Sequence, residues 1–119
     1  MIFSGKRYDQ VLQGIKTATR RPMPPDCTIH RALDGTILEI RCKGRLKWAV
    51  GKTYAVQPGR TKPGGGFFTI KELLIEQVGD ITDAEAVREG MKDRAEFFDV
   101  WKTLNRKFNP EQQIVVIHW

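Results

Sequence analysis

The chain has 119 residues, which fits one domain and is long enough to bury a core without disulfide or metal staples. Hydrophobic residues make up 40% of it, and no apolar run approaches the roughly 20 residues that cross a bilayer. The start, Met1 to Gly5, lacks the apolar core of a signal peptide. We therefore expect a single cytoplasmic domain over 1–119, without membrane contact, as a monomer or a weak dimer.

The net charge of +6 is distributed unevenly. Residues 1–62 contain 13 Lys or Arg against 4 Asp or Glu, a net +9, whereas residues 63–119 contain 7 against 10, a net −3. Clustered cations gain free energy by releasing counterions at phosphates, which favours a nucleic-acid or other polyanionic partner. The alternative is a cationic surface that serves only solubility.

The two cysteines, Cys27 and Cys42, are too few for a disulfide framework and lack the close spacing of a zinc site. We expect them to be reduced thiols, either buried or incidental. Only two histidines, His30 and His118, are present, so a histidine metal site is not expected either. The sequence therefore predicts no metal and no cofactor.

The first elements are a helix and a strand joined by a glycine. A short helix is predicted from Lys6 to Gln13, because apolar residues recur there with the i, i+3, i+4, i+7 spacing of one helical face. Gly14 is placed to end it. Threonine-rich Lys16 to Arg21, stopped by Pro22, is predicted to be a strand.

The next segments favour strands. Thr28 to Leu33 and Thr36 to Cys42 flank Asp34-Gly35, a dipeptide typical of two-residue hairpin turns, so we expect a hairpin that could cover the site. Thr53 to Gln57 is predicted to be a strand, and Phe67 to Val78 to be one long strand or two short ones.

Two helices and a strand are predicted to complete the chain. Thr82 with Glu85 forms a capping-box pair, and Val87 and Met91 supply a short apolar face behind it. A second helix follows Asp93, with a stripe that we expect to pack in the core rather than stack on bases. The stripe consists of Phe97, Val100, Trp101, Leu104 and Phe108. Ile114 to Ile117 is predicted to be a buried strand.

The order of these motifs resembles the ASCH domain, a member of the PUA-like superfamily. The motifs are G-x-K-T-x-T-x-R, a Val-Gly-Lys turn before a strand, "ITDAEAVREGM", "FFDVW" and the last apolar strand. The resemblance covers nearly the whole chain apart from the hairpin around Asp34-Gly35. Together with the element count it implies an α+β fold, a small mixed β-barrel of five to seven strands with about three peripheral helices.

The resemblance also implies a cleft associated with RNA and nucleosides. Bacterial proteins that this chain resembles include small amidohydrolases that remove the acetyl group from N(4)-acetylcytidine, using a Lys, a Thr and a Glu. Matched motif by motif, these positions fall on Lys16, Thr19 and Glu89. Other ASCH proteins are ribonucleases or RNA-binding modules. The Arg20-Arg21-Pro22 segment is closer to phage and bacterial members with no assigned activity.

Amide hydrolysis by these residues requires a neutral Lys16, which would deprotonate Thr19 or a water while Glu89 relays protons. A lysine ordinarily has a pKa near 10.4, so the site must lower it, and a tight ion pair with Glu89 would oppose this. Side chains alternate along a strand, so Lys16 and Thr19 converge only if Lys16 lies in the turn after Gly14.

Three functions remain open: a nucleoside hydrolase, an RNA-binding module without chemistry, and a metal-independent ribonuclease. The residues predicted to bind substrate or RNA are Thr17, Arg20, Arg21, Arg45, Lys47, Trp48 and Lys62. Arg20 and Arg21 cannot face the same way on a strand. By parity with Thr19 we expect Arg21 in the cleft and Arg20 bracing the fold.

Overall fold

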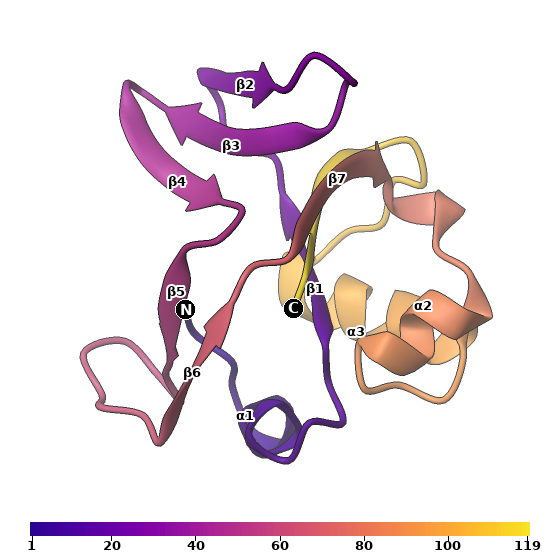
Figure 1. The fold of residues 1–119 in the computed structure, drawn as a ribbon. Helices are drawn as coiled ribbons and strands as arrows, with labels where there is room; N and C mark the ends of the chain where they lie inside the picture. The colour runs from indigo at the N-terminus through magenta and orange to yellow at the C-terminus, as the bar shows by residue number, and fades with distance from the viewer.

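β8 (Gln113–His118) is the central strand of the fold. It pairs antiparallel with β1 (Ala18–Pro22) on one side and with β7 (Glu72–Gln77) on the other. The residues Ile114 to Ile117 are fully buried, because alternate side chains enter two different cores. The computed structural model describes residues 1–119, and Figure 1 shows this sheet in the middle of the molecule.

Two further antiparallel sheets lie to one side of this central sheet (Figure 1). One has three strands, β2 (Cys27–Arg31), β3 (Ile37–Cys42) and β4 (Arg45–Ala49). The other has two, β5 (Thr53–Val56) and β6 (Gly66–Thr69). The first core lies among the three sheets, and its largest members include Phe3, Ile40, Trp48, Phe68 and Leu73.

The second core lies between the central sheet and two helices, α2 (Asp83–Arg88) and α3 (Arg94–Asn105). Val116 of β8 packs there with Phe97 and Trp101 of α3. Trp101 is 4% exposed, which confirms the prediction that it packs. The predicted apolar face behind Thr82 is wrong at Val87, which is exposed because the neighbouring Ala86 turns inward instead.

The predicted closed barrel of five to seven strands is wrong. The chain has eight strands in three separate sheets, with three α-helices and a short 3₁₀ helix, η1 (Val78–Asp80). One physical reason lies at the end of β1, where Pro22 has no N–H for a ladder and the prolines at 24 and 25 follow. The chain therefore leaves the central sheet before β2 begins. The α+β class itself is confirmed.

The helix boundaries follow the predicted signals. α1 (Lys6–Leu12) is followed by Gly14, whose φ is 76°. The hydroxyl of Thr82 accepts from the Glu85 N–H at 3.1 Å at the start of α2. The Asp93 carboxylate caps α3 in the same way. None of the helices is long and apolar enough to span a membrane.

The predicted hairpin is present as β2 and β3, but its loop is longer than two residues. Asp34 Oδ1 accepts from the Thr36 N–H at 2.9 Å, and Gly35 N–H donates to the Ala32 carbonyl at 3.0 Å. No residue between Thr28 and Arg41 lines the cavity beside Lys16 that is described below, so the hairpin does not cover it. Phe67 to Val78 contains two short strands, β6 and β7.

The prediction of reduced thiols is also wrong, because Cys27 and Cys42 form a disulfide. The two residues are directly opposite each other in the register of β2 and β3. Antiparallel pairing thus brings together two side chains that are 15 residues apart in the sequence. The disulfide joins the ends of these strands that lie away from the hairpin loop.

Candidate active site

Lys16 lies at a bend between α1 and β1, outside both elements. Gly14 turns the chain after α1, and the backbone N–H of Lys16 donates to the Gln10 carbonyl at 3.1 Å. β1 begins only at Ala18. Lys16 therefore has the position in the turn that its convergence with Thr19 requires.

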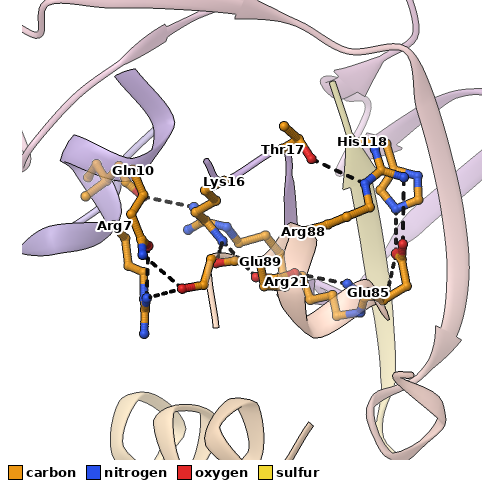
Figure 2. Close-up of polar contacts among 12 residues, drawn as sticks. Arg7, Gln10, Lys16, Thr17, Arg21, Glu85, Arg88, Glu89 and His118 are labelled. Carbon is orange, nitrogen blue, oxygen red and sulfur yellow. Dashed lines mark hydrogen bonds and ion pairs between the residues drawn. The ribbon is translucent and has the colours of Figure 1, made fainter. Parts of the chain in front are cut away.

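Glu89 lies at the end of α2 and reaches Lys16 because of the turn that follows it. Gly90 has a φ of 88°, a left-handed conformation that glycine adopts at little cost. Its carbonyl accepts from the side chains of Gln10 at 2.9 Å and Arg7 at 3.1 Å, so α1 holds this turn (Figure 2). Lys16 Nζ then donates to Glu89 Oε1 at 2.7 Å and to the Glu89 carbonyl at 3.1 Å.

A cavity of about 300 Å³ lies beside this ion pair. The predicted catalytic residues Lys16, Thr19 and Glu89 all line it, and each is at most 5% exposed. Their end of the cavity is charged, whereas α3 supplies an apolar wall. The other lining residues are Ile2, Phe3, Ser4, Arg7, Arg20, Arg21, Pro22, Met91, Phe97, Val100, Trp101, Leu104 and Asn105. Such a mixture of apolar and convergent polar groups is typical of small-molecule sites.

Arg20 is tied into the protein by three carboxylates. Its Nε donates to Glu76 at 3.0 Å, its Nη2 to Glu85 at 2.9 Å and its Nη1 to Glu89 Oε2 at 3.1 Å. Each of the three guanidinium nitrogens thereby has a carboxylate partner, and Nη1 binds the Glu89 oxygen that Lys16 does not bind. Arg20 lines the cavity as Arg21 does, and its carboxylate partners also hold it in place.

Arg21 also lines the cavity but has fewer partners. Its Nη2 donates to the Ile2 carbonyl at 2.9 Å, and its guanidinium carbon lies 5.3 Å from the centre of the Phe3 ring. Its Nε is buried and has no hydrogen-bond partner. Of the two arginines, Arg21 is the one with a buried nitrogen that lacks a hydrogen-bond partner.

Burial lowers the pKa of the Lys16 ammonium below its ordinary value, because the charged form loses hydration. The Glu89 carboxylate opposes this decrease, while the Arg21 and Arg7 cations add to it. Burial acts on Arg20 in the same direction, yet Glu89, Glu85 and Glu76 outweigh it and raise the pKa of the guanidinium. Of Lys16 and Arg20, Lys16 is therefore the cation that gives up a proton more readily.

His118 extends the charged network behind the cavity. This role of His118 was not predicted from the sequence. Its Nδ1 lies 2.8 Å from Glu72 Oε1, and its Nε2 lies 2.7 Å from Glu85 Oε1, the oxygen that also accepts from Arg20. Each ring nitrogen of His118 thus lies within hydrogen-bond distance of a carboxylate oxygen. Figure 2 shows His118 and Glu85 on the opposite side of the network from Arg7 and Gln10. No cluster of His, Cys, Asp and Glu side chains suited to a metal ion is present.

The apolar wall was missed for a different reason. The stripe on α3 was expected to be core, and Phe97 and Trp101 are indeed buried. Val100 and Leu104 extend the same stripe to the cavity, and Leu104 remains 69% exposed. The length of this apolar stripe was the signal in the sequence, because the core does not cover all of it. Arg7 and Phe3 precede the motif and gave no signal.

Most of the other predicted binding residues lie elsewhere. Arg45 and Lys47 line a second pocket, of about 390 Å³, on the β2-β3-β4 sheet. Trp48 is 5% exposed in the first core, so its prediction as a stacking surface is wrong. Lys62 is exposed in the loop between β5 and β6, and the Thr17 hydroxyl accepts from Arg88 Nε at 3.3 Å.

Two solved structures share this arrangement of elements. One is a DUF984 protein from Enterococcus faecalis V583, with a TM-score of 0.63 and 15% identity, covering 96% of this chain and 68% of its own. The other is an ASCH domain from Lactobacillus crispatus JV V101, with a TM-score of 0.54 and 21% identity, covering 93% of this chain and 67% of its own. No protein-family model and no curated protein sequence matches the chain. The chain has an ASCH-like fold.

Proposed function

We propose that this protein is a small hydrolase that removes an acyl group from the exocyclic amine of a modified cytidine such as N(4)-acetylcytidine. The observation that carries the proposal is that Lys16, Thr19 and Glu89 line one cavity with an aromatic and aliphatic wall. At about 300 Å³, this cavity suits one nucleoside rather than a polymer. The ASCH-like fold supports the proposal through the resemblance described above.

Each of the three residues has a distinct role in this reaction. The Thr19 hydroxyl attacks the acyl carbonyl carbon, and its proton goes to the neutral Lys16 amine. The C–N bond breaks, and the departing amine receives that proton through Glu89, which rests 2.7 Å from Lys16 Nζ before substrate binds and re-forms this contact once Lys16 is protonated. A water molecule then hydrolyses the Thr19 ester by the same relay. The sum consumes one water and yields the free amine and the carboxylic acid.

The Lys16–Glu89 ion pair must open for this reaction to begin. Glu89 Oε2 stays bound to Arg20 at 3.1 Å, so the carboxylate keeps one cationic partner when Lys16 leaves. Removing the Glu89 contact also removes the main influence that raises the pKa of Lys16, while burial and the nearby arginines remain. A substrate that inserts between the two side chains would therefore produce the neutral amine.

The test is release of cytidine from N(4)-acetylcytidine, followed by chromatography. We expect Lys16→Ala and the isosteric Thr19→Val to lose activity while circular dichroism shows an intact fold. Lys102→Ala is the matched control, since this lysine is exposed on α3 outside the cavity. A wild-type protein that releases nothing at high enzyme concentration would exclude the proposal.

RNA binding without chemistry is the second candidate, and one observation favours it. Lys43, Arg45 and Lys47 line the second pocket beside Pro24 and Pro25, with no carboxylate among the lining residues. Such a site can follow a phosphate backbone. It predicts binding of single-stranded RNA whose affinity falls steeply with salt, and fluorescence anisotropy at two salt concentrations measures this. Affinity that does not respond to salt would argue against it.

A further inference from the structure

Only two buried side-chain polar atoms in the whole chain lack a hydrogen-bond partner, Arg21 Nε and Trp101 Nε1. Both residues line the same cavity, Arg21 from β1 and Trp101 from α3. Buried polar groups in folded proteins are nearly always paired, because an unpaired one has lost its hydration without compensation. The coincidence of both exceptions at one cavity points to the ligand of that cavity.

The surrounding residues show that this chain otherwise pairs its buried polar groups. Lys16, Arg20, Glu89 and His118 are each at most 6% exposed, and all of them have charged partners at hydrogen-bond distance. Packing alone does not require the indole of Trp101. A phenylalanine there, like Phe97 on the same face of α3, would fill apolar space without burying an N–H group.

The two groups define what kind of ligand they can bind. An indole N–H and a guanidinium N–H donate and never accept, so the ligand must supply acceptors. Four cations line the cavity, Arg7, Lys16, Arg20 and Arg21. Carboxylates bind Lys16 and Arg20, whereas Arg7 and Arg21 have no carboxylate partner. This balance favours a carbonyl or carboxylate oxygen over an amine. The wall of α3 favours a planar, apolar body.

We propose that Trp101 and Arg21 are specificity-determining residues, whose N–H groups bind acceptor oxygens on a planar ring such as a carbonyl-bearing pyrimidine. Both atoms are shielded from solvent, so we expect a side-chain rotation to bring each N–H group to the acceptor. The inference deepens the proposed hydrolase function by stating how the base is recognised, and it rests on that function only for the identity of the base.

The experiment follows the indole N–H signals of the protein by nuclear magnetic resonance. Trp101→Phe assigns the Trp101 signal, and Trp48→Phe is the matched control, a buried tryptophan outside the cavity. The probes are N(4)-acetylcytidine, benzoate and benzylamine, where the last two share a ring but carry a carboxylate or an ammonium. We expect the first two to shift the Trp101 signal downfield and benzylamine to leave it unchanged.

Affinity supplies the second measurement. Trp101→Phe should weaken binding of whichever acceptor probe the wild type binds by up to about tenfold, the usual scale of one hydrogen bond, and Trp48→Phe should not. Arg21→Lys, which keeps the charge but removes Nε–H, should weaken it similarly. Equal affinities for wild type and Trp101→Phe, or an unmoved Trp101 signal with both acceptor probes, would overturn the inference.

The two proposals can fail separately. If N(4)-acetylcytidine is hydrolysed while the Trp101 signal stays unmoved, the inference is wrong and the proposed function stands. If nothing is hydrolysed but benzoate shifts the Trp101 signal, the proposed function is wrong and the inference stands.

Discussion

The cavity region and the β2-β3-β4 sheet are both rich in charge, but they use it in opposite ways. Beside the cavity, Lys16, Arg20 and Glu89 are at most 5% exposed and are bound to one another through Glu89. On the sheet, Arg41 and Glu39 form an ion pair of 3.2 Å with side chains that are 41% and 26% exposed. Similar residue types therefore make a desolvated site in one region and a hydrated surface in the other.

The largest expected effect comes from removing a carboxylate from each region. Glu89→Ala leaves two buried cations without their shared partner, which typically costs about 3–5 kcal/mol. Glu39→Ala removes a solvent-exposed pair with a typical value of about 0–1 kcal/mol. Chemical denaturation of both variants measures the free energies of unfolding. Equal losses would mean that burial does not separate the two regions.

Two glycines with similar backbones give a second matched pair. Gly90 and Gly44 have φ values of 88° and 77°, so alanine at either position is strained by roughly 1–2 kcal/mol. A Cβ at Gly90 would also clash with Gln10 Oε1, whereas one at Gly44 meets nothing within 4 Å. Gly90→Ala should therefore lower the free energy of unfolding more than Gly44→Ala, as measured by denaturation.

The same pair distinguishes stability from function. The turn at Gly90 positions Glu89, because Gln10 and Arg7 both bind the Gly90 carbonyl. Displacing the Gln10 amide should reduce hydrolysis in Gly90→Ala even at temperatures where the protein remains folded. Gly44→Ala lies outside the main cavity and should keep full activity. Equal activity in the two variants would show that the hydrogen bonds from α1 to the Gly90 carbonyl do not position Glu89.

Local signals in the sequence predicted most elements but not how the sheets assemble. Helix caps such as Thr82 and Asp93 act within four residues, so pattern alone identified them. Closure of a barrel requires strands far apart in the sequence to pair at the edges of the sheet. Pro22 ends β1, so the chain leaves the central sheet there. The disulfide was missed because the facing of Cys27 and Cys42 is a consequence of strand register, which spacing does not reveal.

The candidate site was predictable only in part. The glycine before Lys16 indicated the turn, and the resemblance assigned Thr19 and Glu89 to the same site. The partners of Arg20 could not be predicted, since Glu76 and Glu85 are more than 50 residues away in sequence. The solvent exposure of single side chains could not be predicted from the sequence either. Trp48 was expected at a binding surface but lies in the core, while the neighbouring cations line the second pocket.

Acid should affect the cavity region through Glu85. Burial alone would raise the pKa of this carboxyl, but its hydrogen bonds from Arg20 and His118 lower it below the ordinary value of 4.5. The unfolded chain then binds more protons in this range, so the stabilisation is complete above about pH 4.5 and is lost as pH falls through the lower folded value. Glu85→Gln should flatten the acid limb of stability against pH. An unchanged limb would contradict this.

The smallest effect on stability is expected for cations on the β2-β3-β4 sheet, in contrast to the large effect expected for Glu89→Ala. Lys43→Gln, Arg45→Gln and Lys47→Gln each alter an exposed side chain, so each should change the free energy of unfolding by no more than about 0.5 kcal/mol. If the second pocket binds RNA, each substitution should nevertheless reduce the slope of log affinity against log salt by about 1. Lys102→Gln, outside both pockets, should leave that slope unchanged. A hydrated surface can thus lose charge without losing stability, whereas the cavity region cannot, because its cations are buried and solvent only poorly replaces a missing carboxylate.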